Sequence, residues 1–135
     1  MSQALCHKIK EPCKLENTKI TSKDYVVYSL AVIAGILIWV LSPTITGQQE
    51  PWDSESSYYF VSLFIAGAFC GALHPIKIWR WAVAIYFGQL LAAMIVAMGP
   101  LILLGVFFLA GYTLVALAGA ASAAALVTMY KERHI

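Results

Sequence analysis

The stretch Tyr25–Leu41, YVVYSLAVIAGILIWVL, contains seventeen residues and no charged side chain. A helix of that length measures about 25 Å at 1.5 Å per residue, which is close to the ~30 Å hydrocarbon core of a bilayer. Asp24 and Ser42 flank the stretch and extend it into the interface, so it predicts a transmembrane helix over residues 24–42. Pro43 follows, and because the residue before a proline disfavours the helical conformation, we expect the helix to end there.

Three more apolar segments follow along the chain, and they predict spans over residues 54–73, 78–98 and 101–130. His74-Pro75 ends the second span, and Gly99-Pro100 forms a sharp turn before the last one. The last segment has about 30 residues and a helical length of roughly 45 Å, so it must tilt, bend or project from the membrane. An alternative is that residues 100–106 form a short re-entrant piece before the true span.

The composition supports this interpretation. The 135 residues are 61% hydrophobic and 12% charged, with a mean hydropathy of +0.77, whereas soluble domains carry about 25% charged residues. We therefore predict one all-α domain, residues 24–130, that is an integral membrane four-helix bundle. Short turns favour antiparallel packing of consecutive helices as neighbours.

The positions of the basic residues predict the orientation. All nine Lys and Arg residues fall in residues 1–23, in the turn after the second span, or in residues 131–135. Basic residues stay on the cytoplasmic side during insertion, so both termini are predicted to be cytoplasmic, in a multi-pass membrane protein. Small size, short turns and the lack of an N-x-S/T site favour a prokaryotic inner membrane. A net charge of +2 is too small to suggest a nucleic-acid partner.

The polar N-terminal segment, residues 1–23, is predicted to be a flexible cytoplasmic tail, with a short helix on the membrane surface as the alternative. Cys6, His7 and Cys13 do not have the spacing of a standard zinc site and lack an evident fourth ligand. We therefore expect no metal and no cofactor. Reduced cysteines are the simplest expectation, and lipid attachment at Cys6 or Cys13 stays open.

No Asp, Glu, Lys, Arg or His lies in the hydrocarbon part of the predicted spans, since Asp24, Glu55 and Arg80 stand at their ends. Ion-coupled carriers usually keep such a group inside the membrane, so its absence weakens that class. The chain also lacks a nucleophile with a nearby base, a set of metal ligands and a glycine-rich phosphate loop. We therefore predict that the protein is not an enzyme.

Tyr86 and Gln89 form a small polar spot near the middle of the third span, and Thr113 is a further polar group in the fourth. Gln89 is the most costly of the three to bury. A hydrogen bond from Gln89 to another helix would stabilise the bundle by about 0.6–2 kcal/mol. A pore-lining or ligand-binding role for these three residues is the alternative.

Small residues at spacings of three and four let helix backbones approach closely. The second and fourth spans contain such residues, which predict helix packing: Gly67, Gly71, Gly111, Ala116, Gly119, Ala120, Ala123 and Ala124. Packing within the bundle and association with a second copy or another membrane protein both remain open.

Aromatic and basic side chains gather around the turn after the second span. These residues are predicted to face lipid headgroups: His74, Lys77, Trp79, Arg80 and Trp81. At the opposite end of the second span, Tyr58, Tyr59 and Phe60 predict an aromatic girdle.

Together these features predict a small non-catalytic membrane protein that acts through helix–helix assembly as an accessory or scaffold subunit. The lipid bilayer and a second copy or another membrane protein are its expected partners. The alternative is a homo-oligomeric channel or small-solute transport protein.

Overall fold

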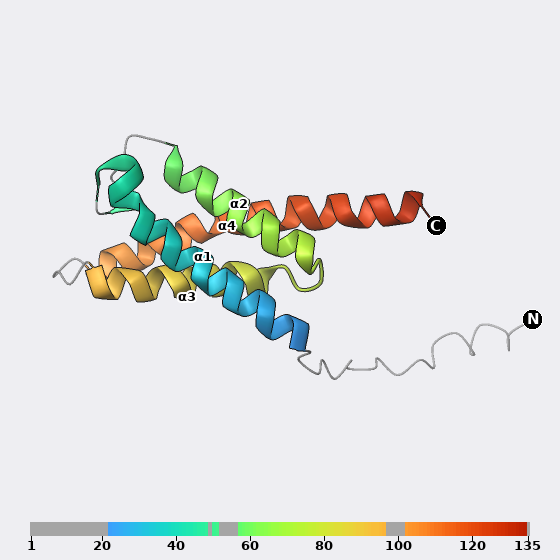
Figure 1. Cartoon of the computed structure of the whole chain (residues 1–135), viewed down its shortest axis with the longest axis horizontal. Helices are drawn as coiled ribbons and strands as arrows, with labels where there is room; N and C mark the ends of the chain where they lie inside the picture. The colour runs from blue at the N-terminus through green and yellow to red at the C-terminus, as the bar shows by residue number, and fades with distance from the viewer. Residues whose placement is uncertain (1–21, 49, 52–56, 97–101, 135) are drawn as a thin grey trace, which may run out of the picture.

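The computed structural model describes residues 22–48, 50–51, 57–96 and 102–134. Over these residues the fold is all-α, which confirms the predicted class. Figure 1 shows its four helices, α1 (Ser22–Thr46), α2 (Tyr58–Leu73), α3 (Trp79–Val96) and α4 (Ile102–Arg133). The tail with Cys6, His7 and Cys13 lies outside the described residues, as do residues 52–56 and 97–101, where two predicted spans begin or end.

Helix α1 does not end at Ser42, as the sequence predicted, but continues through Pro43 to Thr46. Side chains stabilise the last turn, since Thr46 Oγ1 donates to the Ser42 carbonyl at 2.9 Å and Ser42 Oγ donates to the Gln48 carbonyl at 2.9 Å. Gly47 then ends the helix with a φ of 76°, a conformation that glycine adopts at little cost. These local hydrogen bonds outweigh the helix-breaking tendency of the proline.

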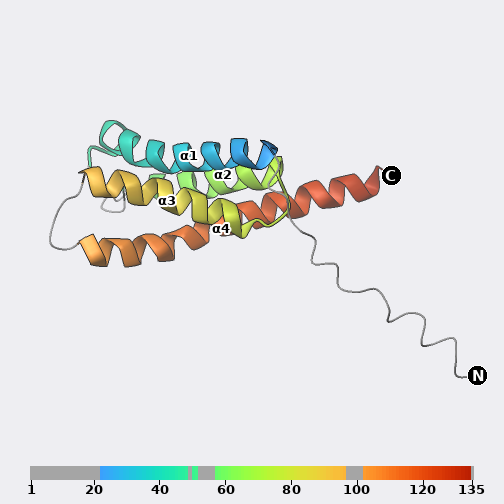
Figure 2. The ribbon, with the colours of Figure 1, turned by 90° about the horizontal axis from the view of Figure 1, so that it is seen from below.

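Helix α4 is one continuous helix of 32 residues. Residues 102–106 are the start of this helix and do not form a separate piece before it, while residues 100 and 101 lie outside the described residues. Figure 2 shows that the C-terminal turns of α4 continue past the ends of the other three helices. At its C-terminal end α4 therefore projects beyond the bundle.

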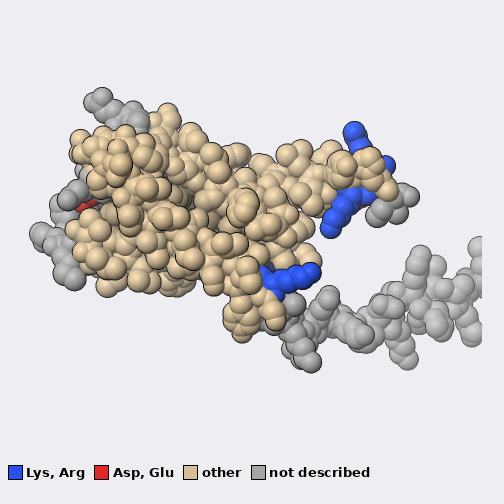
Figure 3. Space-filling model, viewed as in Figure 1, with Lys and Arg blue, Asp and Glu red and all other residues tan. Residues whose placement is uncertain are grey.

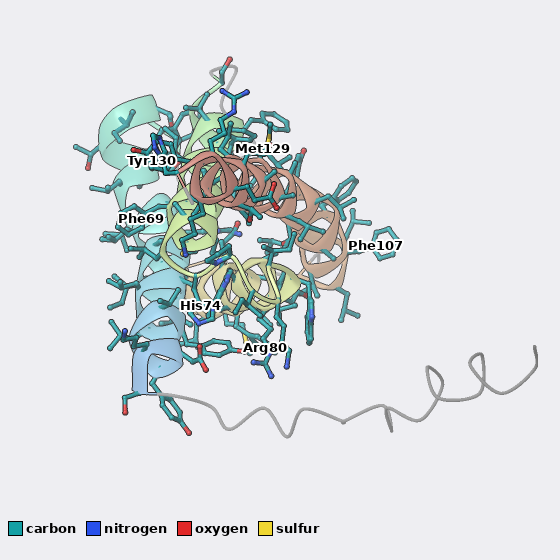
Figure 4. All side chains as sticks on the ribbon, turned by 90° about the vertical axis from the view of Figure 1, so that its right-hand side faces the viewer. Phe69, His74, Arg80, Phe107, Met129 and Tyr130 are labelled. Atoms are coloured by element: carbon teal, nitrogen blue, oxygen red, sulfur yellow. The ribbon has the colours of Figure 1, made fainter. Side chains whose placement is uncertain are left out.

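Three helices, α1, α3 and α4, are long and apolar enough to cross a membrane. Helix α2 is also apolar but has 16 residues, about 24 Å at 1.5 Å per residue. Large apolar side chains cover the outside of the bundle, with Leu103 80% and Phe107 78% exposed, and Phe107 points away from the helices in Figure 4. Soluble monomers rarely expose such continuous apolar surface, whereas a helical membrane bundle does.

Consecutive helices run in opposite directions, as predicted, but the most extensive contacts join helices that run in the same direction. Helix α1 packs most closely on α3, and α2 on α4. Consecutive helices also touch, with less contact, and the contact between α2 and α3 is the smallest of these. The molecule is therefore built from two parallel pairs, α1·α3 and α2·α4, a pairing that short turns alone did not predict.

The described Lys and Arg side chains lie at one end of the bundle, where α1 and α3 begin and where α2 and α4 end (Figure 3). We call this the basic end. The turn containing Gly47 and the start of α2 lie at the opposite end.

Candidate functional site

Glycines bring α2 and α4 into backbone contact. A Cβ atom added at Gly67 would overlap the backbone of Ala116, one at Gly71 would overlap Ala120, and one at Gly119 would overlap Phe64. Gly67, Gly71, Ala116, Gly119 and Ala120 are all buried. These predicted packing residues therefore hold the α2·α4 pair together.

The other predicted packing residues differ in their surroundings. Ala124 is buried at 7% exposure, and Ala123 is partly buried. Gly111 is exposed, and an added Cβ there would meet nothing within 4 Å. Gly111 thus takes no part in packing within the described residues of the bundle.

A second glycine contact, between α1 and α3, was not predicted from the sequence. A Cβ at Gly35 would overlap the carbonyl of Ile85, and a Cβ at Gly88 would overlap the carbonyl of Val32. Gly35 thus contacts the residue three positions before Gly88, and Gly88 contacts the residue three positions before Gly35. This reciprocal contact is what a symmetric pair of parallel helices gives. The sequence pattern that could have predicted this contact is a spacing of four between small residues, Ala31 and Gly35 on one helix and Ala84 and Gly88 on the other. Small residues four apart lie on one face of a helix.

Helix α4 keeps one face of small residues outside the bundle. Gly111, Ala118, Ser122 and Ala125 are exposed, and their spacings of seven, four and three place them on one side of the helix. Ser122 Oγ donates to the Ala118 carbonyl of the same helix at 2.8 Å. We call these four residues the open face of α4.

A buried polar pair links α2 to α3. Tyr59 donates its hydroxyl proton to Gln89 Oε1 at 2.5 Å, and the two residues are 1% and 0% exposed. Gln89 Nε2 has no hydrogen-bond partner among the described residues. Because Tyr59 belongs to the α2·α4 pair and Gln89 to the α1·α3 pair, this bond joins the two pairs where their contact is smallest.

The polar residues predicted to act together do not converge. Thr113 donates to the Leu109 carbonyl of its own helix at 2.8 Å. Tyr86 packs, partly buried, against the apolar cluster that contains Trp39 and Leu109. Gln89 binds Tyr59 instead, which the sequence had suggested only as part of an aromatic girdle. The ring of Tyr59 packs edge-on against Tyr112 at 5.1 Å.

At the start of α2, Tyr58 donates its hydroxyl proton to the Ile38 carbonyl of α1 at 3.0 Å. The two adjacent tyrosines of α2 therefore both bond across to the α1·α3 pair.

At the basic end, a contact between a carboxylate and an imidazole joins α1 to the turn between α2 and α3. His74 Nε2 lies 3.1 Å from Asp24 Oδ1, and Trp81 Nε1 donates to the His74 carbonyl at 2.9 Å. Trp81 is 1% exposed and Asp24 7%, whereas Trp79 is 58% exposed. Of the residues predicted to face headgroups, His74 and Trp81 therefore lie against the bundle, and Trp79 lies on its surface.

Within the described residues, no group of three His, Cys, Asp or Glu side chains is placed to hold a metal ion. Comparison of the chain with known protein families, curated proteins and solved structures found no match.

Proposed function

We propose that this chain is a non-catalytic, multi-pass membrane protein that acts through helix–helix assembly, as an accessory or scaffold subunit. In the proposed topology all four helices cross the bilayer and the basic end lies in the cytoplasm, in agreement with the position of the Lys and Arg side chains. The apolar outer surface of the bundle supports insertion.

The observation that carries the proposal is the open face of α4. The exposed residues of the other helices are mostly large and apolar, as expected for contact with lipid. By contrast, Gly111, Ala118, Ser122 and Ala125 are small, and small residues on one face of a helix allow another helix backbone to approach closely. The equally small residues Gly67, Gly71 and Gly119 are already in use inside the bundle, so they do not serve this role.

Self-association is the simplest form of this proposal to test. We expect the protein in mild detergent to form a discrete oligomer by light scattering, and the double variant Ala118→Leu, Ser122→Leu to be monomeric because leucine separates the backbones. Ala72→Leu, which enlarges an exposed small residue of α2, is the matched control and should keep the oligomer.

A discrete oligomer that survives the double variant would show that the open face is not the contact. A monomeric wild-type protein at every concentration would exclude self-association and leave a different membrane protein as the partner.

A channel or small-solute transport protein is the second candidate. The unpartnered Gln89 Nε2 favours it, since a buried amide donor is costly inside an apolar bundle. Thr113 and Ser29 favour it less, because each bonds a carbonyl of its own helix. Flux of a small polar solute into liposomes containing the protein, abolished by Gln89→Leu, would support transport; the absence of flux would count against it.

A further inference from the structure

The turn between α2 and α3 mixes exposed apolar side chains with cationic ones. Leu73, Ile76 and Trp79 are 50%, 62% and 58% exposed. Lys77 and Arg80 alternate with them along the chain and are partly buried. Figure 4, which looks at the basic end, shows Arg80 on the same part of the molecule as His74. Apolar and cationic groups thus share one short segment.

The backbone of this turn is held in a defined shape. The His74 N–H donates to the Cys70 carbonyl at 3.1 Å, and the Arg80 N–H donates to the Lys77 carbonyl at 3.0 Å. Lys77 has a φ of 56°, in the left-handed region that few residues other than glycine adopt. Strained conformations of this kind persist where the surrounding structure fixes them, and they gather at functional sites.

The acidic side chain at the start of α1 contacts the first residue of this turn. Asp24 is buried and pairs with His74. Among the described residues, no carboxylate forms an ion pair with Arg80. The planar guanidinium of arginine matches the geometry of phosphate oxygens and binds them through two hydrogen bonds.

We propose that the α2–α3 turn binds the headgroup of an anionic phospholipid. Arg80 and Lys77 contact the phosphate, while Leu73, Ile76 and Trp79 contact the glycerol and the first part of the acyl chains. The exposed apolar side chains point to a lipid rather than free phosphate, since inorganic phosphate has no apolar part to bury. This inference goes beyond the proposed function, because lipid binding at the turn requires no assembly.

The test is native mass spectrometry of the full chain in mild detergent, with phosphatidylglycerol and phosphatidylcholine of identical acyl chains as probes. We expect preferential retention of phosphatidylglycerol, which excess inorganic phosphate does not displace. The double variant Lys77→Asn, Arg80→Gln should lose this preference by about tenfold or more. Asparagine is chosen at position 77 because it tolerates the left-handed conformation.

The matched control is Lys131→Gln, Arg133→Gln, which removes the same charge from the end of α4 and should keep the preference within about twofold if the turn is the site. If both double variants lost the preference for phosphatidylglycerol equally, the overall positive charge of the basic end would explain the binding, and the proposed site at the turn would be wrong. Equal binding of the two lipids by the wild type, or displacement by inorganic phosphate, would overturn the proposal without any variant.

Discussion

Gln89 and Tyr59 form a side-chain hydrogen bond between the two helix pairs. Their hydrogen bond is fully buried and crosses from one parallel pair to the other. Burying either polar group in an apolar bundle without a hydrogen-bond partner costs free energy. The bond therefore favours the arrangement in which it can form over arrangements in which one helix pair is shifted along the other.

We predict that Tyr59→Phe and Gln89→Leu are coupled. Each single change leaves the other polar group without its partner, whereas the double variant removes both groups. The unfolding free energies, measured by denaturant titration in detergent micelles, should give a coupling of about 0.6–2 kcal/mol. Additive effects in this double-mutant cycle would mean that the bond contributes nothing to stability.

The sequence could predict Gln89 as a costly residue but could not predict its partner. Tyr59 lies 30 positions away on a different helix, and no local spacing relates the two. Pro43 is a similar case, since the helix continues there because of hydrogen bonds from Ser42 and Thr46 that depend on their side-chain conformations.

At the scale of the helix, close contacts at glycines determine which helices pack together. Both parallel pairs rest on glycines that meet a backbone carbonyl of the partner helix, Gly35 and Gly88 in one pair and Gly67 and Gly119 in the other. Uncharged runs and proline or glycine turns were enough to predict four helices. They were not enough to predict the pairing, because small residues four apart occur on several helices and any two such faces can pack.

We predict opposite effects for two glycines of α4. Gly119→Ala should destabilise the bundle by about 1–3 kcal/mol, because the added methyl group overlaps the backbone at Phe64. Gly111→Ala, the matched control on the same helix, should be neutral or stabilising by up to about 1 kcal/mol, because its surroundings are open. Thermal unfolding in detergent distinguishes the two, and equal losses at both positions would contradict the α2·α4 interface.

For the whole molecule, the gathering of cations at one end predicts how the proposed spans lie in a membrane. On a background in which Cys6, Cys13 and Cys70 are replaced by serine or alanine, we predict that Gln48→Cys reacts with an impermeant maleimide in intact cells. Lys23→Cys and Arg133→Cys, at the basic end, should react only after the membrane is permeabilised.

The same labelling experiment tests how many times the chain crosses the membrane. If Lys23→Cys and Arg133→Cys reacted from opposite sides, the chain would cross an odd number of times, and the four-span topology would be wrong. Labelling of both from the outside would keep the count and reverse the orientation.

The interleaved pairing also sets an order of events during synthesis. The partner of α1 is α3 and the partner of α2 is α4, so neither pair can close when the first hairpin alone has been made. A ribosome must complete α3 before Gly35 is covered, and must complete nearly the whole chain before Gly67 is. Any product that stops after α3 leaves the glycine face of α2 uncovered, and quality-control proteases should remove such nascent fragments rather than let them accumulate.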